Sequence, residues 1–152
     1  MSVIGDLASG IFDTEFDSNT GAASISSISG WLQHNLGALN VYLNTDFSGT
    51  DPEFADEENA IFTNLYMGHY YKKQALNALR GIASDANSLL EVTEGDTTIR
   101  LTNKNEVSKN FRAISNDYFE EAKKLVHNYT MYQAEPQQLV GYEAGTGSLY
   151  SY

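Results

Sequence analysis

The chain has 152 residues, of which 41% are apolar, and its formal net charge is −11. This length predicts a single domain, residues 1–152, with a hydrophobic core, and the composition argues against wholesale disorder. The absence of cysteine excludes disulfides, thiol nucleophiles and thiolate metal sites. No apolar run approaches the ~18 residues of a membrane span, and the N-terminus lacks the pattern of a secretory signal, so no membrane association is expected.

The charge is distributed unevenly along the chain. The first 71 residues contain ten acidic residues and neither lysine nor arginine. Nucleic-acid binding depends on clustered lysine and arginine, so no specific nucleic-acid surface is expected. An acidic first half is typical of a solvated face, of a surface for a basic protein partner, or of a surface that does not retain DNA.

Residues 1–23 are predicted to form an extended N-terminal arm, because two glycines weaken the helical spacing of the apolar residues there. Acidic residues alternate from Asp13 in a way that is superficially similar to a calcium loop. That loop needs glycine at its sixth position and glutamate at its twelfth, and these positions hold Ser18 and Ser24. We therefore expect a polar arm in this region and no metal site.

Residues 24–43 predict the first helix of the core. Apolar residues three or four positions apart form one stripe: Ile25, Ile28, Leu32, Leu36, Leu39 and Leu43. Gly30 and Gly37 interrupt this helix, and each lowers its stability by up to roughly 1 kcal/mol relative to alanine. Their small size would let another backbone approach, from the long helix that follows or from a neighbouring subunit. Trp31 lies beside the stripe, where it packs in the core or at an interface.

Residues 52–82 predict one long helix of about 45 Å, which is too long to pack on itself. Asp51 is a suitable N-cap, Pro52 suits the first turn, and several carboxylates follow near the positive end of the helix dipole. Aromatic residues at four-residue spacing give the helix a second apolar stripe, so it needs cover on more than one side. The candidate subunit-interface residues are Trp31, Phe62, Tyr66 and Tyr70.

Residues 89–102 change to a two-residue period, which predicts a β-hairpin. A turn at Gly95 and Asp96 brings similar or complementary side chains together on both faces of the hairpin. The expected pairs are Val92 with Ile99, Leu90 with Leu101, Thr93 with Thr98, and Glu91 with Arg100. An isolated hairpin is only marginally stable in water, so its apolar face needs support.

Residues 103–134 predict the third helix. Asn103 and Glu106 form a variant of the capping box, and Pro136 is expected to stop the helix. Its 32 residues match the length of the helix at 52–82, and the hairpin joins the two. We therefore expect these long helices to lie antiparallel.

Residues 137–152 are predicted to form an extended C-terminal tail, rich in glycine and serine but also aromatic. Such a tail is suited to ordering on a partner, for example by adding to a sheet edge, and the alternative is a flexible terminus. The candidate partner-binding residues are Leu139, Val140, Tyr142, Leu149, Tyr150 and Tyr152.

The sequence contains no recognisable catalytic constellation. His34, His69 and His127 are scattered, and none has a second histidine or a carboxylate at the spacing of a helical zinc or di-iron site. The nucleophile elbow and the phosphate-binding glycine loop are both absent. We therefore expect a protein that is not an enzyme, with no catalytic residue, no metal and no cofactor.

The expected fold class is mainly α. Two long antiparallel helices and a shorter helix form a bundle over residues 24–136, with a β-hairpin insertion at about 89–102 and extended termini. In this layout, and in the segments SISGWLQHNLGALNVYLNTDF and EENAIFTNLYMGHYYKKQALNALRG, the chain over residues 24–134 resembles the head-to-tail connector, or neck adaptor, proteins of tailed bacteriophages.

The resemblance implies a structural virion protein, made in the host cytoplasm and located in the neck of the phage. Such a protein forms a homo-oligomeric ring of about twelve copies below the portal protein, consistent with closed cyclic assembly. Each C-terminal tail then docks on the portal or on further neck or tail proteins, and DNA passes through the central channel. The resemblance implies no catalytic or ligand residue.

Three further hypotheses follow. An acidic channel wall would repel DNA and ease its passage. The chain is alternatively another neck or tail component, such as a stopper or a tail-completion protein. It is also compatible with a small cytoplasmic helical module that binds a protein.

Overall fold

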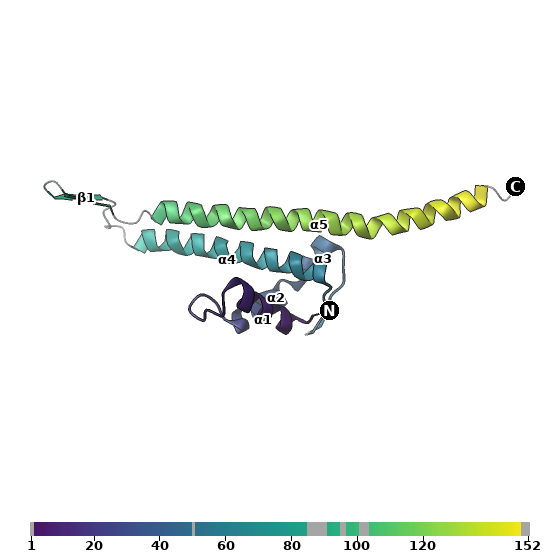
Figure 1. The fold of residues 1–152 in the computed structure, drawn as a ribbon, viewed down its shortest axis with the longest axis horizontal. Coiled ribbons are helices and arrows are strands. Elements are labelled where there is room, and N and C mark those ends of the chain that lie inside the picture. The colour runs from purple at the N-terminus through teal and green to yellow at the C-terminus, as the bar shows by residue number, and fades with distance from the viewer. Residues whose placement is uncertain (1, 50, 85–90, 95–96, 101–103, 150–152) are drawn as a thin grey trace. The chain divides into compact units, whose positions relative to one another are not determined.

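The computed structural model describes the backbone of residues 2–49, 51–84, 91–94, 97–100 and 104–149, and the side chains of residues 2–49, 51–80 and 105–133. This part of the chain is mainly helical (Figure 1). Its elements are α1 (Ile4–Glu15), α2 (Ile25–His34), α3 (Leu36–Leu43), α4 (Asp56–Ser84), β1 (Glu91–Glu94), β2 (Thr97–Arg100) and α5 (Lys104–Leu149). They divide into two compact units: unit 1 combines residues 1–63 with 121–152, and unit 2 comprises residues 64–120.

The prediction of an extended N-terminal arm is wrong, because residues 4–15 form α1. The apolar residues of α1 at helical spacing are buried: Ile4, Leu7, Ala8, Ile11 and Phe12. Gly5 and Gly10 lie on the exposed side of the helix. Each glycine lowers helix stability by about 1 kcal/mol, whereas burial of one large apolar side chain stabilises by about 1.5–3 kcal/mol. Tertiary packing against α2 therefore outweighs the low helix propensity.

The segment after α1, where the sequence is superficially similar to a calcium loop, is a turn closed by its own hydrogen bonds. The Ser18 hydroxyl donates to Asp13 Oδ1 at 2.7 Å, and the Gly21 amide donates to Asn19 Oδ1 at 2.9 Å. Asp17 and Ser18 adopt positive φ angles of 48° and 56°. No group of three or more potential metal ligands occurs among the described residues.

The single helix predicted over residues 24–43 is instead two helices, α2 and α3, which meet at Asn35. Asn35 donates to the Trp31 carbonyl oxygen from both its backbone amide, at 3.0 Å, and its side chain, at 2.9 Å. Such side-chain competition for a backbone carbonyl disfavours a continuous helix. The predicted apolar stripe is confirmed from Ile28 to Leu43, where all five residues are buried, whereas Ile25 is 42% exposed.

Helix α4 begins at Asp56, four residues later than predicted, and Asp51 does not cap it. The backbone at Phe54 pairs with Ser2 through two hydrogen bonds, of 2.9 and 3.1 Å, and is therefore extended. The cap comes from Glu58, whose Oε2 accepts a hydrogen bond of 2.7 Å from the Ala55 amide. This carboxylate satisfies one of the amides left unpaired at a helix start.

The core of unit 1 is built from large apolar and aromatic side chains of α1–α3 and the start of α4. Its most deeply buried members are Phe54, Phe62, Ile11, Ile28, Leu32, Leu39 and Ile61. The Phe54 ring contacts Phe47 and Phe62 edge to face, with centroid separations of 4.9 and 5.7 Å. Offset and edge-to-face contacts of this kind stabilise aromatic cores beyond simple area burial.

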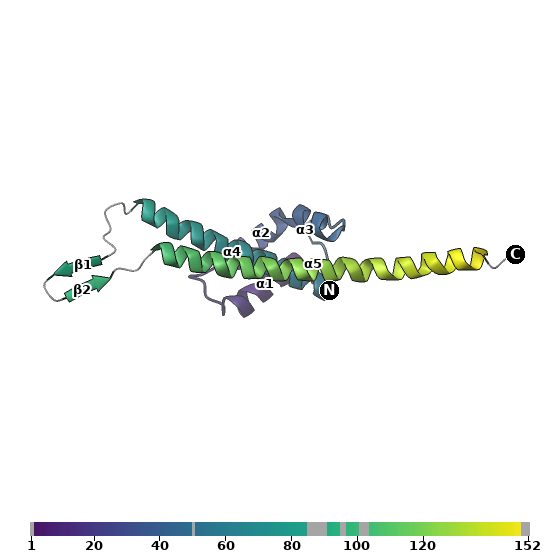
Figure 2. The same cartoon turned by 90° about the horizontal axis from the view of Figure 1, so that it is seen from above.

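In unit 2, α4 and α5 lie antiparallel, as predicted, and both views show them side by side (Figures 1 and 2). The Ser108 and Ser115 hydroxyls donate to the carbonyl oxygens of Ala75, at 3.1 Å, and Gly68, at 2.7 Å. A Cβ atom on Gly68 would lie 2.8 Å from the Phe119 ring, so a larger residue at this position would force the ring or the helices to shift. By contrast, no atom lies within 4 Å of the corresponding point at Gly30 or Gly37, so neither glycine serves a close contact with the long helix.

Strands β1 and β2 pair antiparallel within unit 2. The register places Glu91 opposite Arg100, Val92 opposite Ile99, and Thr93 opposite Thr98, which are the pairs given by the alternation of the sequence. The expected turn at residues 95–96 and the pair of Leu90 with Leu101 lie outside the described residues.

Helix α5 continues to Leu149, so the prediction that Pro136 stops the helix, and that residues 137–149 are extended, is wrong. Proline removes one backbone donor and disfavours a helix interior, but a long helix can continue beyond it with a local adjustment. Residues 150–152 lie outside the described part of the chain. Among the described residues, none of the helices combines the length and apolar character needed to cross a membrane.

Candidate protein interface

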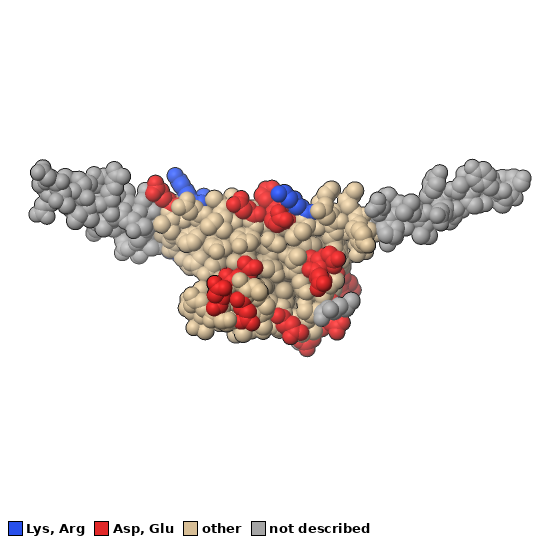
Figure 3. All heavy atoms as spheres, in the orientation of Figure 1, with Lys and Arg blue, Asp and Glu red and all other residues tan. Residues whose placement is uncertain are grey.

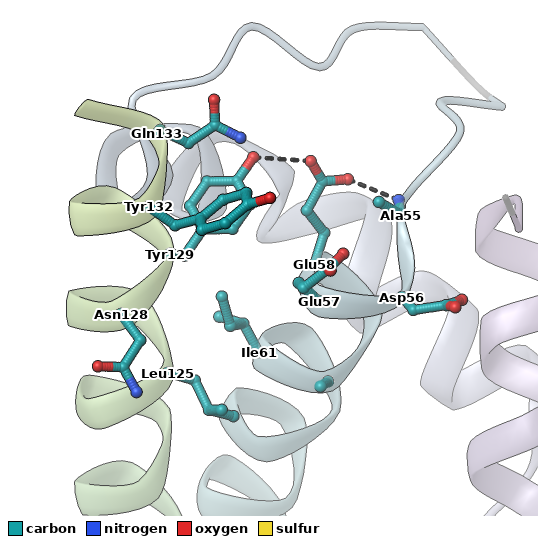
Figure 4. A pocket seen from close by; sticks show the side chains of 11 residues that line it. Ala55, Asp56, Glu57, Glu58, Ile61, Leu125, Asn128, Tyr129, Tyr132 and Gln133 are labelled. Carbon is teal, nitrogen blue, oxygen red and sulfur yellow. Dashed lines mark hydrogen bonds between the residues drawn. The ribbon is translucent and has the colours of Figure 1, made fainter. Parts of the chain in front are cut away.

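A groove in unit 1 runs between the start of α4 and the middle of α5 (Figure 4). Its volume is about 620 Å³, within the range of roughly 300–1,000 Å³ that is typical of ligand pockets. From residues 55–61 it is lined by Ala55, Asp56, Glu57, Glu58, Ala60 and Ile61, and from α5 by Leu125, Asn128, Tyr129, Tyr132 and Gln133.

The groove is organised around the buried carboxylate of Glu58, which is only 9% exposed. One oxygen of Glu58 accepts from the Ala55 amide at 2.7 Å, and the other accepts from the Tyr129 hydroxyl at 2.8 Å (Figure 4). Burial, together with the hydrogen bond to Glu58 and its negative charge, raises the pKa of Tyr129 to about 12. The tyrosine therefore remains a neutral donor at physiological pH, and it fixes the Glu58 side chain in place.

The remaining groove residues combine exposed carboxylates with apolar surface. Asp56 and Glu57 are exposed, and no lysine or arginine of the described residues pairs with either of them. In Figure 4 the Asp56 side chain points away from α5, which leaves Glu57 as the closer acidic group. Tyr132 is 75% exposed and lines the groove beside Leu125, so the α5 side of the groove presents accessible apolar and aromatic surface.

Acidic groups dominate residues 1–63 beyond the groove as well. On the face drawn in Figure 3, the region of α1 and α2 shows several clusters of aspartate and glutamate, and no lysine or arginine. Residues 1–63 contain ten acidic residues and no basic residue, so this pattern follows directly from the sequence. A surface of one sign raises the local concentration of oppositely charged partners.

The four predicted subunit-interface residues separate into two classes. Phe62 and Tyr66 are 0% and 5% exposed, so the prediction is wrong for them: both are buried within a single chain. Trp31 and Tyr70 are half-buried, and their place at an interface stays a prediction. The Trp31 ring also contacts Phe62, at a centroid separation of 6.0 Å, so part of its surface serves the core of unit 1.

Tyr70 belongs to a cluster of aromatic side chains in unit 2. Tyr71 stacks on Tyr118 at a centroid separation of 5.8 Å and contacts Phe111 at 6.0 Å and Tyr70 at 5.3 Å. Tyr66 lies one helical turn before Tyr70, and burial raises its pKa to about 12, with a smaller contribution from Tyr70. The ring contacts between α4 and α5 in this cluster are made by Tyr71, and Tyr70 joins the cluster through Tyr71.

The histidines of the described part of the chain do not assemble a site. Burial lowers the pKa of His69, and the positive charges of Lys73 and Lys72 lower it further, so this imidazole is neutral at pH 7. His34 and His127 are exposed. The side chains of the predicted tail residues, Leu139, Val140, Tyr142, Leu149, Tyr150 and Tyr152, lie outside the described part.

No pattern in the sequence predicted the groove. Glu58 and Tyr129 are 71 residues apart, and they meet only because α4 and α5 run in opposite directions. Two signals were present in the sequence. One was the run of three acids at the start of one long predicted helix, and the other was the pair of tyrosines near the end of the second long predicted helix. Comparisons of the chain with known protein families, with curated proteins and with solved structures find no match.

Proposed function

We propose that the chain is a structural virion protein, an adaptor that forms a ring below the portal and links capsid to tail in a tailed bacteriophage. The proposal starts from the resemblance of residues 24–134 to neck adaptor proteins. A mainly helical fold with two long helices agrees with it.

The observation that carries the proposal is the apolar surface that a single copy leaves uncovered. Large hydrophobic side chains are exposed in both units: Ile25, Val41, Tyr42, Leu76, Ile114, Met131 and Tyr132. Val41 is 81% exposed although the opposite face of α3 is fully buried. The adjacent pairs Val41–Tyr42 and Met131–Tyr132 give exposed apolar surface suited to contacts between subunits, and head-to-tail contacts between identical subunits can close into rings.

The distribution of charge supports a passage for DNA. Seven acidic side chains are exposed between residues 46 and 58 and at the end of α1. They all belong to residues 1–63, which contain no lysine or arginine. In a ring that presents this region to the channel, the wall repels DNA and does not retain it. Charge mapping of the assembled ring tests this part: a neutral or basic inner wall contradicts it.

Co-assembly with a phage portal protein tests the adaptor function directly. The full-length chain and a chain ending at Pro136 are each mixed with portal rings, and the complexes are measured by light scattering and negative-stain microscopy. We expect a ring of about twelve subunits on the portal for the intact chain, as for closed cyclic assemblies. The truncated chain is expected to dock more weakly, and equal docking by both chains rejects the role of the tail.

The groove of unit 1 favours a second candidate, a helical module that binds a protein without forming a ring. Other neck components, such as a stopper or a tail-completion protein, also remain alternatives to the adaptor. A chain that stays monomeric in the presence of portal, yet binds another protein through unit 1, supports the module and contradicts the adaptor.

A further inference from the structure

The groove between the start of α4 and α5 has a chemistry that selects its occupant. Its walls offer the apolar side chains of Ile61 and Leu125 and the exposed ring of Tyr132. At its edge stands Glu57, exposed and without a cationic partner among the described residues. An apolar channel with an anionic edge matches a side chain that has an aliphatic stem and a positively charged end.

The local electrostatics exclude an anion. The start of a helix carries about half a positive charge, which alone would attract an anion. Here Asp56, Glu57 and Glu58 occupy the first turn of α4, and their carboxylates outweigh the dipole. The two basic residues of unit 1, Lys123 and Lys124 on α5, do not line the groove, and Lys124 pairs with Glu121 at 3.8 Å. A cation is therefore the complementary ligand.

The groove is held open by internal bonds and does not need the ligand to form. Glu58 is fixed by the Ala55 amide and the Tyr129 hydroxyl, so the α4 and α5 sides of the groove are tied together. A fixed groove binds without first ordering its walls, which lowers the entropic cost of association.

The geometry points to this groove as the docking site for an arginine- or lysine-bearing segment of another protein. The aliphatic stem lies against Ile61 and Leu125. The charged end lies over the Tyr132 ring and pairs with the Glu57 carboxylate, and the amide oxygens of Asn128 and Gln133 are further acceptors along α5. This inference does not rest on the adaptor function, because it holds for any protein that presents such a segment.

The probe is a blocked hexapeptide that alternates leucine and arginine, compared with the same peptide carrying citrulline in place of arginine. Citrulline keeps the shape of arginine and removes its charge. Binding to the full-length chain is measured by fluorescence anisotropy, and the site is mapped by amide chemical shifts. We expect the shifts to centre on residues 55–61 and 125–133, and the citrulline peptide to bind roughly tenfold more weakly.

Three variants separate a site from a diffuse acidic surface. Glu57→Gln should weaken binding by about three- to fivefold and Tyr132→Ala by about threefold, as expected for an exposed ion pair and a cation–π contact. Glu15→Gln is the matched control, because Glu15 is an exposed acid of unit 1 that does not line the groove. All three substitutions change exposed side chains, so circular dichroism should show an unchanged fold.

Specific outcomes overturn the inference. The inference is wrong if Glu15→Gln weakens binding as much as Glu57→Gln, or if the amide chemical shift changes spread over α1 and α2. The peptide then binds through the net negative charge of unit 1 and not in the groove. If the groove amides shift with increasing protein concentration in the absence of peptide, the occupant is a second copy of this chain and not a basic segment of another protein.

Discussion

Unit 1 contains 13 acidic and two basic residues, whereas unit 2 contains seven of each, so the whole net charge of −11 belongs to unit 1. Unit 2 is neutral although it carries seven of the nine basic residues. A single net charge for the chain hides this division. Unit 1 is suited to basic partners or to repulsion of nucleic acid, and unit 2 has no such bias.

The two units also differ in how they are stabilised. Unit 1 has a core of large side chains from several helices, with Phe54, Phe62 and Leu32 fully buried. Unit 2 contains two antiparallel helix segments that approach at Gly68 and are joined by hydrogen bonds from Ser108 and Ser115. Substitution of a large side chain by a smaller one should therefore destabilise unit 1 the most. Substitution of a small side chain by a larger one should destabilise unit 2 the most.

The largest effect is expected for Phe54→Ala in unit 1. Phe54 is fully buried between Phe47 and Phe62, so its removal leaves a cavity and lowers the free energy of unfolding by about 3–5 kcal/mol. Urea denaturation followed by circular dichroism measures the change. Tyr42→Ala, at a position that is 54% exposed, is the control and should remain within about 0.5 kcal/mol of the unmodified chain.

A smaller loss is expected for Tyr129→Phe, which removes the hydroxyl that donates to Glu58. The buried carboxylate keeps only the Ala55 amide, and loss of a hydrogen bond to a charged group destabilises by about 1.5–3 kcal/mol. Tyr132→Phe is the control, because Tyr132 is 75% exposed and should tolerate the change. Equal stability of the two variants in urea denaturation would show that the bond to Glu58 does not stabilise unit 1.

Gly68→Ala tests the close approach in unit 2. The added methyl group would lie 2.8 Å from the Phe119 ring, so we expect destabilisation by about 1–2 kcal/mol in spite of the better helix propensity of alanine. Combination with Phe119→Leu should restore part of the loss. Gly30→Ala in α2, where no atom lies within 4 Å, should instead stabilise by up to about 1 kcal/mol, and thermal unfolding distinguishes the two signs.

The smallest effects concern alkaline pH, where each unit contributes one tyrosine with a pKa of about 12, Tyr66 in unit 2 and Tyr129 in unit 1. These values exceed the ordinary value of 10, so the neutral form is favoured in the folded chain. Their contribution to stability is therefore present below pH 10 and is lost as the pH rises through 12.

Phenolate absorbance against pH should show these two titrating late, together with Tyr70, whose pKa is also raised by burial and by Tyr71. Tyr66→Phe and Tyr129→Phe should each remove one late-titrating group. If the absorbance lost in either variant falls in the ordinary range near pH 10 and not in the late part of the curve, the assignment for that tyrosine is contradicted.

The parts of the fold that the sequence predicted are those set by local periodicity. The three- and four-residue spacing of Ile28, Leu32, Leu36 and Leu39 identified a buried face, and that face is buried although the helix divides at Asn35. The helical character of α4 and α5 and their antiparallel direction followed from two long apolar patterns of similar length joined by a predicted hairpin.

The errors have a common physical origin, the competition between local propensity and tertiary contacts. The glycines of α1 lower its propensity, but burial of Phe12 and its apolar neighbours stabilises the helix. At the start of α4, pairing of Phe54 with Ser2 replaces a helical turn that Asp51 and Pro52 favoured. Phe62 and Tyr66 belong to the aromatic stripe that was expected to need cover from a neighbouring subunit, and both are instead buried within the chain.

The sequence by itself determined the helical class of this protein, the acidic character of its first half and the absence of cysteine chemistry, since each depends on composition or on neighbours within a few residues. Only the tertiary structure decided which aromatic side chains are buried and where a groove lies. The pairing of Glu58 with Tyr129 shows why: a contact across 71 residues depends on how two helices are aligned, and no local pattern encodes that alignment.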